Sequence, residues 1–360
     1  MAATSGSRTP WWAWTWPALA WLILPAMFLV PNGLLAAVAG AVLVATVFAA
    51  VYHAEVVAHR VGEPFGTLVL AVAVTVIEVA LIVSVMVANP EEKAGLARDT
   101  VFAAVMIVCN GIVGLCLLAG GARHHEQGFQ VHGASAALAV LAALTILTLV
   151  MPNVATTAPG PFLSKAQLVF AGIVSLALYA AFVFIQTVRH RDYFLSADPG
   201  EDTHATPPSN TTALISLGLL IAALVAVVGL AKALTPTVEI AIARVSAPKA
   251  VVGIVIAALV LLPEGLAALR AARANRLQTS LNLALGSALA SIGLTIPTVA
   301  VVSIVLDQPL ELGLNAKDQV LLALTLLVST ITLGTGRTTV LQGMVHLVIF
   351  AVFLFFAVVP

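Results

Sequence analysis

Residues 66–88 read GTLVLAVAVTVIEVALIVSVMVA, and Glu78 is the only charged side chain in this stretch. As an α-helix the stretch would be about 34 Å long, enough to cross the hydrocarbon core of a bilayer, which is about 30 Å thick. A carboxylate at mid-depth costs at least about 2.5–3.5 kcal/mol, so it normally faces the interior of a helix bundle and serves a function. The alternative is a protonated glutamate that only hydrogen-bonds a neighbouring helix.

The composition extends this interpretation to the whole chain. Of 360 residues, 61% are hydrophobic and only 9% are charged, whereas a soluble domain carries about 25% charged residues. The formal net charge is zero, so nothing indicates a nucleic-acid partner, and the expected partners are membrane lipid and transported cations. The N-terminal run, which begins among five tryptophans, is interpreted as a retained membrane span rather than a cleaved signal.

The apolar runs predict an all-α polytopic membrane protein with about eleven transmembrane helices. Their approximate limits are 12–30, 34–57, 66–88, 100–119, 133–151, 166–188, 213–233, 250–269, 281–306, 320–333 and 339–359. A turn signal, Pro31-Asn32-Gly33, separates the first two runs. The longest polar segment, 189–212, reads as an acidic linker loop, and a solvated linker is favoured over a cation sensor.

These runs suggest four parts: an extra N-terminal helix (1–33), a first repeat (34–188), the linker (189–212) and a second repeat (213–360). If the predicted spans alternate in direction, nine lysine and arginine residues fall on the side of the N-terminus and seven on the other side. The cluster Arg270, Arg273 and Arg276 sits on the richer side at a helix end, where such charges count most. We therefore expect a cytoplasmic N-terminus.

A second carboxylate lies inside a span, in VVGIVIAALVLLPEGLAALR at 251–270. Pro263, just before Glu264, removes one intrahelical hydrogen bond, and Gly265 weakens the helix further. The sequence therefore predicts a helix broken at membrane depth, of the kind that lines a cavity and offers free carbonyls to a cation. The alternative is a glutamate that reaches the interface and pairs with Arg270.

Glu78 and Glu264 fall on the third and eighth predicted spans, so their helices should run in opposite directions. Each is followed by a polar span, 100–119 with Asn110 and 281–306 with Asn282, Ser287 and Ser291. Two inverted five-helix repeats that each bring a carboxylate to mid-membrane are typical of secondary transporters. The small residues in these spans also suit close helix packing alone.

Two carboxylates with amide and hydroxyl oxygens form a hard-oxygen site that suits Ca²⁺. When the site is empty, burial and like-charge repulsion favour the protonated carboxyls, so protons compete with the cation. The leading hypothesis is a cation/proton antiporter that works by alternating access, with Na⁺ or K⁺ as rival substrates. An intramembrane enzyme with paired carboxylates and a passive channel are more distant alternatives.

Other titratable residues carry weaker signals. Glu55 and His59 share a helix face at the end of the second span and could relay protons or guard an entrance, although an ordinary interfacial helix end fits as well. His346, alone in the last span, is interpreted as a satisfied core histidine. No motif for a resident metal, a phosphate-binding loop or a nucleophile elbow occurs, so no cofactor is expected.

Three long stretches carry a family resemblance. They are GEPFGTLVLAVAVTVIEVALIVS (62–84), LLPEGLAALRAARANRLQTSLNLALGSALASIGLTIP (261–297) and STITLGTGRTTVLQGMVHL (329–347). They resemble the bacterial ChaA-type calcium/proton antiporters of the cation/calcium exchanger superfamily. The resemblance implies a multi-pass protein of the bacterial inner membrane that exchanges Ca²⁺ for H⁺, with Na⁺ or K⁺ as further candidate substrates.

The resemblance also implies ion ligands. In the superfamily each repeat carries a Gly-Asn-x-x-Glu motif, whose glutamate Glu78 and Glu264 match; Thr75 and Leu261 stand where the motif has asparagine, and only the threonine can offer an oxygen. Asn110 and Gly286-Ser287 match further family positions, and Ala290 replaces a glutamine of many relatives. The predicted cation ligands are Glu78, Glu264, Asn110, Asn282, Ser287, Thr75 and Ser291. The predicted proton-coupling residues are Glu78 and Glu264, with Glu55 and His59 as additional candidates.

Overall fold

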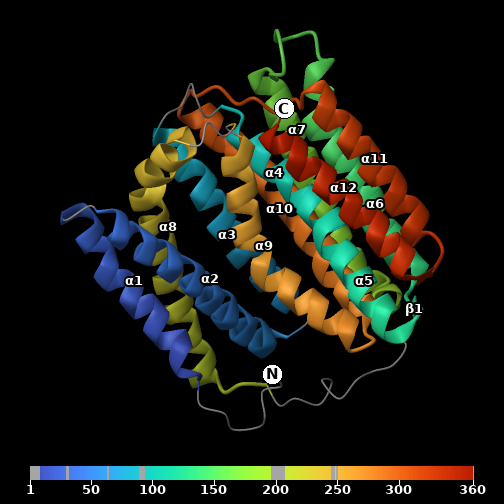
Figure 1. Cartoon of the computed structure of the whole chain (residues 1–360), viewed down its shortest axis with the longest axis horizontal. Coiled ribbons are helices and arrows are strands. Elements are labelled where there is room, and N and C mark those ends of the chain that lie inside the picture. The colour runs from blue at the N-terminus through green and yellow to red at the C-terminus, as the bar shows by residue number, and fades with distance from the viewer. Residues whose placement is uncertain are drawn as a thin grey trace. The chain divides into compact units, whose positions relative to one another are not determined.

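The computed structural model describes residues 9–29, 32–62, 65–88, 94–195, 207–244, 248 and 250–359 (Figure 1). Most of the acidic part of the predicted linker, at 196–206, lies outside the described residues.

Helices account for nearly all of the described chain. They are α1 (Trp11–Leu29), α2 (Gly33–Val61), α3 (Phe65–Ala88), α4 (Leu96–Met106), α5 (Val113–His124), α6 (Val131–Thr145), α7 (Lys165–Phe184), α8 (Asn210–Arg244), α9 (Ala250–Arg273), α10 (Leu277–Val305), α11 (Ala316–Leu333) and α12 (Val340–Val358). Shorter pieces are the π-helical turns η1 (Ile107–Ile112), η2 (Ile146–Val150) and η4 (Ile185–Arg189), the 3₁₀ turns η3 (Met151–Asn153) and η5 (Arg191–Tyr193), and the strands β1 (Gln127–Gly128) and β2 (Arg337–Thr338).

The predicted all-α membrane architecture is confirmed. Within the described ranges, ten helical segments are long and apolar enough to cross a membrane, and α4, η1 and α5 together form one of them. An eleventh, α3, has 24 residues and contains the apolar stretch Val69–Ser84.

Two helices differ from the sequence-based expectation. The expected break at Pro263 is wrong, because α9 runs without interruption from Ala250 to Arg273. A proline inside a helix removes a single backbone hydrogen bond, and packing against neighbouring helices compensates for that loss. The other difference is α8, which continues beyond the predicted limit at Ala233 and through Pro236 to Arg244.

Helix starts follow side-chain capping. Ser164 and Gln167 form a capping box at the start of α7, and Thr339 and Gln342 form another at the start of α12. In both, the hydroxyl residue and the glutamine satisfy each other's backbone N–H groups. Because α7 and α12 are the last helices of the two predicted repeats, these repeats would end with helices that begin in the same way.

The described chain divides into two compact units, residues 1–85 with 198–247 and residues 86–197 with 248–360. In the first unit α1, α2 and α8 pack against one another (Figure 1). A buried histidine, His53 of α2, holds α1 through a 3.0 Å hydrogen bond from Nε2 to the Ala13 carbonyl. At the other end of α2, Arg60 donates to Asn210, the first residue of α8, over 2.7 Å.

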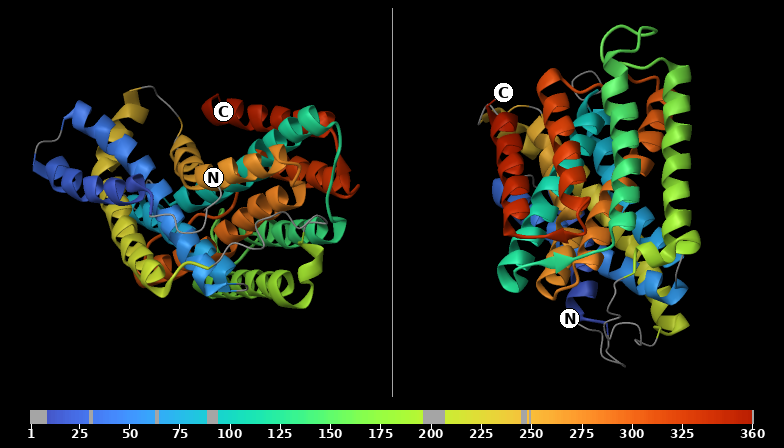
Figure 2. Two further views of the ribbon diagram at one scale, coloured as in Figure 1. Left: turned by 90° about the horizontal axis from the view of Figure 1, so that it is seen from below. Right: turned by 90° about the vertical axis from the view of Figure 1, so that its right-hand side faces the viewer.

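Two helix pairs of the second unit pack in a way that matches the predicted repeats. The closing helix of each repeat packs on the polar helix of the other repeat: α7 lies along α10, and α12 lies along α5. Each of these two crossings ends in a loop pairing. Strand β1, which follows α5, pairs with β2, which precedes α12 (Figure 2, right). In the counterpart, Phe162 before α7 forms an antiparallel bridge with Glu311 after α10.

Candidate functional site

Glu78 lies in the middle of α3 as the fourteenth of its 24 residues. The side chain is 1% exposed, and Thr75, one turn earlier, is 6% exposed. A carboxylate in this position is the expensive intramembrane group that the sequence predicts. Thr75 and Glu78 lie on neighbouring positions of one helix face because their spacing is three residues.

Glu264 is the fifteenth of the 24 residues of α9 and is 9% exposed. Its helix packs closely on α4, and a Cβ added at Gly253 would lie 2.8 Å from the Thr100 backbone nitrogen. Next to Glu264, a Cβ at Gly265 would lie 3.1 Å from Cδ1 of Ile112 in η1. The missing Cβ atoms of these two glycines therefore allow α9 to approach α4 and η1, which fixes the depth of Glu264.

The predicted ligands on α10 lie at different heights. Ser291 is the fifteenth residue of this 29-residue helix and is 3% exposed, whereas Ser287 is half-buried one turn earlier. Asn282 lies nine residues before Ser291, about 13 Å away along the helix axis. Its amide accepts from Gln278 Nε2 at 2.9 Å and donates to the Phe194 carbonyl. A single cation with ligands at 2.3–2.6 Å cannot contact both Asn282 and Ser291.

Asn110 lies in η1, fully buried, with its carboxamide turned toward α11 and α12. Its Nδ2 donates to Thr325 Oγ1 at 2.9 Å, and its Oδ1 is 3.1 Å from Nδ1 of His346. Gly111 and Gly114 leave room for α12, because added Cβ atoms there would lie 3.3 Å from the Phe350 ring and 3.1 Å from His346 Cβ. The structure thus brings Asn110 together with polar groups of the second repeat, and its role as a cation ligand stays a prediction.

The candidate proton-relay pair occupies the end of α2. Glu55 and His59 are both exposed, with His59 in the last turn of the helix. The described geometry fits either an entrance or an ordinary helix end, so their proton role stays a prediction.

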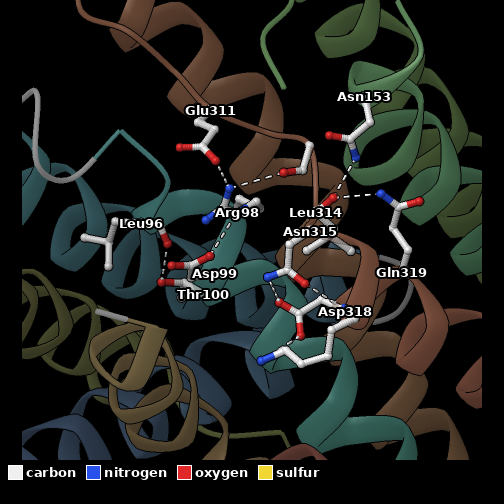
Figure 3. Close-up of polar contacts among 12 residues, drawn as sticks. Leu96, Arg98, Asp99, Thr100, Asn153, Glu311, Leu314, Asn315, Asp318 and Gln319 are labelled. Atoms are coloured by element: carbon white, nitrogen blue, oxygen red, sulfur yellow. Dashed lines mark hydrogen bonds and ion pairs between the residues drawn. The ribbon is translucent and has the colours of Figure 1, made fainter. Parts of the chain in front are cut away.

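A cluster of charges surrounds Arg98 near the start of α4 (Figure 3). Its guanidinium pairs with Asp99 at 2.8 Å and with Glu311, and it donates to the Gly313 carbonyl at 3.2 Å. One arginine therefore pairs with two carboxylates. Nearby, Asn315 caps α11 and contacts Asp318, while Asn153 and Gln319 both donate to the Leu314 carbonyl. The cluster ties the loop before α11 to α4.

The sequence-based interpretation of His346 as a satisfied core histidine is confirmed, because both ring nitrogens have hydrogen-bond partners. What the sequence did not indicate is the identity of these partners. Thr325 and Thr332 of α11 and Asn110 of η1 complete a buried polar cluster. The only advance signal was an isolated histidine in an apolar span; its partner lies 236 residues away in the chain.

The chemistry available is that of buried oxygen ligands. Among the described residues, no group of three or more histidine, cysteine, aspartate or glutamate side chains is placed to hold a metal ion. Glu78 and Glu264 are each buried at mid-helix within their own unit. Buried carboxylates can exchange a bound cation for protons, because the cation and the protons each neutralise a negative charge that is costly in a membrane.

Comparisons with known proteins agree with the architecture. The chain is 50% identical over 359 residues to y4hA of Sinorhizobium fredii, which is named as an ionic transporter, and the match covers 98% of each protein. It is 36% identical over 316 residues to the sodium-potassium/proton antiporter ChaA of Escherichia coli K12, covering 87% of this chain and 85% of the relative.

Solved structures with low sequence identity share the fold. The structure of YfkE has a TM-score of 0.73 and 18% identity and covers 96% of this chain and 100% of that protein. The H⁺/Ca²⁺ exchanger CAX has a TM-score of 0.72 and 16% identity, with coverage of 94% and 86%. The family model described as sodium/calcium exchanger protein matches residues 32–188 and again 215–359. The chain is therefore a multi-pass antiporter, not an enzyme, and belongs to the sodium/calcium exchanger protein family.

Proposed function

We propose that this protein exchanges Ca²⁺ for H⁺ across the bacterial inner membrane by alternating access. Glu78 and Glu264 bind either the cation or protons. The observation that carries the proposal is the placement of these two glutamates, which are 1% and 9% exposed at the middle of α3 and α9. Burial favours the neutral form of a carboxylate, and a divalent cation or two protons would neutralise the two glutamates.

Calcium is favoured by the type of ligand. Carboxylate, hydroxyl and carbonyl oxygens suit a hard cation with a large coordination number. A solved structure of YfkE is described as a Ca²⁺/H⁺ antiporter, and CAX is described as an H⁺/Ca²⁺ exchanger. These descriptions support the same substrate for this chain.

A monovalent cation is the second candidate, because the relative ChaA is named a sodium-potassium/proton antiporter. The charge balance differs between the two. One Na⁺ or K⁺ neutralises one carboxylate and leaves the other protonated, so a single proton is displaced. Ca²⁺ neutralises both and displaces two.

Additional ligands are assigned by depth. Thr75 and Ser291 lie near the middle of their helices and are proposed to complete the cation site, with Ser287 one turn away from Ser291. Asn282, near the start of α10, is proposed to act only at a neighbouring step of the ion path. Glu55 and His59 are proposed to pass protons at the end of α2.

Proton release from the purified protein tests the proposal. At weak buffering, adding Ca²⁺ should release close to two protons per bound ion, whereas Na⁺ or K⁺ would release one. Glu78→Gln and Glu264→Gln should each abolish Ca²⁺-driven release, while Glu126→Gln, an exposed glutamate outside the spans, should not. Release at the wild-type level from either buried-site variant would refute the mechanism, and release with Na⁺ or K⁺ alone would establish the second candidate.

Orientation has a separate test. We propose that the N-terminus is cytoplasmic, which with eleven spans places the C-terminus outside. Alkaline phosphatase fused after residue 360 should then be active, and a fused fluorescent protein should not fluoresce.

A further inference from the structure

The buried cluster around His346 has hydrogen-bond directions that can be worked out from one end. It joins His346 of α12, Asn110 of η1, and Thr325 and Thr332 of α11, all of which are at most 4% exposed. Every member belongs to the second unit.

Thr325 sets the first direction. Its hydroxyl has one proton and lies 2.7 Å from the Leu321 carbonyl, which can only accept. Toward Asn110 the hydroxyl oxygen therefore accepts, and the atom of the carboxamide facing it at 2.9 Å is the NH₂ group. The other carboxamide atom, which faces His346, must then be the carbonyl oxygen Oδ1.

The imidazole follows from this assignment. Oδ1 of Asn110 can only accept, so Nδ1 of His346 at 3.1 Å carries the proton. In a neutral ring Nε2 is then an acceptor, and the Thr332 hydroxyl donates to it over 3.2 Å. The donors form one directed chain, from Thr332 through His346 and Asn110 to Thr325.

The second buried histidine has the opposite tautomer. Nε2 of His53 is 3.0 Å from the Ala13 carbonyl, so Nε2 carries the proton there. Its Nδ1 is buried with no hydrogen-bond partner among the described residues. The described residues thus include two fully buried histidines, and their tautomers are opposite, which provides an internal control.

The turn that carries Asn110 also reaches Glu264. Asn110 and Ile112 are two residues apart, so their side chains point in directions about 160–200° apart around the helix. Asn110 faces α11 and α12, and Ile112 contacts Gly265 beside Glu264. The turn is π-helical: Val113 N–H bonds the Val108 carbonyl, five residues back. A wide turn of this kind needs support from neighbouring side chains, and π-turns occur frequently at functional sites.

We propose that His346 is a positioning residue for transport: as the Nδ1–H tautomer it holds Asn110 and so fixes the π-helical turn whose opposite face, at Ile112, packs beside Glu264. The proposal rests on the proposed function of Glu264 as a cation and proton ligand. It assigns Asn110 a supporting role, in which Oδ1 accepts from the imidazole and the carboxamide holds the turn in place. In the second unit, His346 therefore helps to position the ion ligand Glu264 without touching the ion itself.

Nitrogen NMR of the purified protein with ¹⁵N-labelled histidine tests the tautomer without any transport assay. Signals are assigned by their loss in His346→Gln and His53→Gln. We expect an Nδ1–H ring for His346 and an Nε2–H ring for His53. An Nε2–H ring at His346 would overturn the proposal whether or not the protein transports Ca²⁺.

Transport by reconstituted vesicles tests the positioning role, with whichever of Ca²⁺, Na⁺ or K⁺ the wild type exchanges for protons. His346→Gln and Asn110→Leu should each lower the rate about tenfold, and the double variant should be no slower than either within about twofold, because the residues act as a unit. His346→Asn, whose amide takes the place of Nδ1–H, should keep at least about half the rate, as should the control His53→Gln.

The outcomes separate the two proposals. Multiplicative losses in the double variant, or a wild-type rate in His346→Gln, would overturn the positioning role while leaving Glu264 as the ion ligand. If a variant does not elute as a single species on gel filtration, Thr332→Val takes its place, because it removes only the hydroxyl donor to Nε2. We expect Thr332→Val to transport approximately threefold more slowly than the wild type. An unchanged rate would count against the proposal.

Discussion

The two helix crossings of the second unit are counterparts in the inverted repeat but are held together differently. At the α5–α12 crossing the backbones touch: a Cβ added at Gly343 would lie 2.5 Å from the Leu118 backbone nitrogen. At the α7–α10 crossing a Cβ at Gly172 would meet Pro297 Cα at 3.4 Å, an ordinary contact. The first crossing also contains the Asn110–His346 hydrogen bond.

The loop pairings at the ends of the crossings differ in the same way. Beside β1 and β2, Gln127 donates to the Ala272 carbonyl at 2.9 Å and to Asn275 at 3.0 Å, so the support is from neutral amides. The counterpart at Glu311 is supported by ion pairs with Arg98. The two crossings therefore share an arrangement of helices but are supported by different side-chain chemistry.

The largest expected effect on stability comes from adding a methyl group at the α5–α12 crossing, where the backbones touch. Gly343→Ala should lower the free energy of unfolding by about 1–3 kcal/mol, because the Leu118 backbone must move away to admit the new methyl group. Thermal unfolding in detergent, followed by the helical signal in far-ultraviolet circular dichroism, measures the change. Gly172→Ala is the matched control at the looser crossing and should unfold at the same temperature as the wild type. Equal losses of stability in the two variants would contradict the difference between the crossings.

A smaller loss is expected from removing one hydroxyl of the buried cluster. Thr332→Val keeps the side-chain shape but removes the donor to His346, at a cost of about 1 kcal/mol. Ser175 of α7 is also buried, and its hydroxyl has no hydrogen-bond partner among the described residues, so Ser175→Ala should be neutral or slightly stabilising. The same unfolding assay distinguishes them, and a larger loss for Ser175→Ala would contradict the comparison.

Salt should distinguish the two loop pairings. Glu311→Gln removes a partly exposed ion pair with Arg98 and should cost about 0.5 kcal/mol at low salt, and the cost should shrink at 1 M NaCl because ions screen the pair. Gln127→Leu removes neutral hydrogen bonds, so its loss should not depend on salt. Unfolding at two salt concentrations provides the measurement; equal salt dependence would mean that charge does not matter at Glu311.

The smallest effect is expected at Asp307, which follows α10. A hydrogen bond and the charge of Lys165 hold the pKa of its carboxyl below the usual value. A lowered native pKa adds stability above the unfolded pKa of about 3.9, and that stability is lost as the pH falls through the native pKa. Both side chains are exposed, at 71% and 82%, so water screens the pair. Asp307→Asn should unfold at the same temperature as the wild type at pH 7. A clearly lower unfolding temperature would show that this ion pair helps to stabilise the crossing.

Local physical rules predicted much of this molecule. The cost of an intramembrane charge identified Glu78 and Glu264, and both are buried at mid-helix. The apolar runs predicted the helices, because a membrane span is decided by its own residues. The turn signal at 31–33 falls where α1 and α2 are separate, and Asn32 caps α2 with a 2.8 Å hydrogen bond to the Leu35 N–H.

Features that depend on distant parts of the chain were not predictable in this way. The π-helical turn at Ile107–Ile112 lies in an apolar run that reads as ordinary helix, and its support comes from α11 and α12. Pro263 suggested a break, yet α9 continues to Arg273 and packs against Ile112 at Gly265, a contact that the sequence around Pro263 does not reveal. Partners for Asn110 could not be chosen from sequence spacing, since they lie more than 200 residues away.

The hydrogen bond between His346 and Asn110 also imposes an order on the synthesis of the protein. Asn110 is translated 236 residues before His346, which at about 5–20 residues per second is a delay of roughly 12–47 seconds. For most of that time the buried carboxamide lacks both its acceptor, Thr325, and its donor, His346, and an unsatisfied polar group in lipid costs several kcal/mol. The turn that carries Asn110 therefore gains its full set of hydrogen bonds only after α12, more than 200 residues later in the chain, has been made.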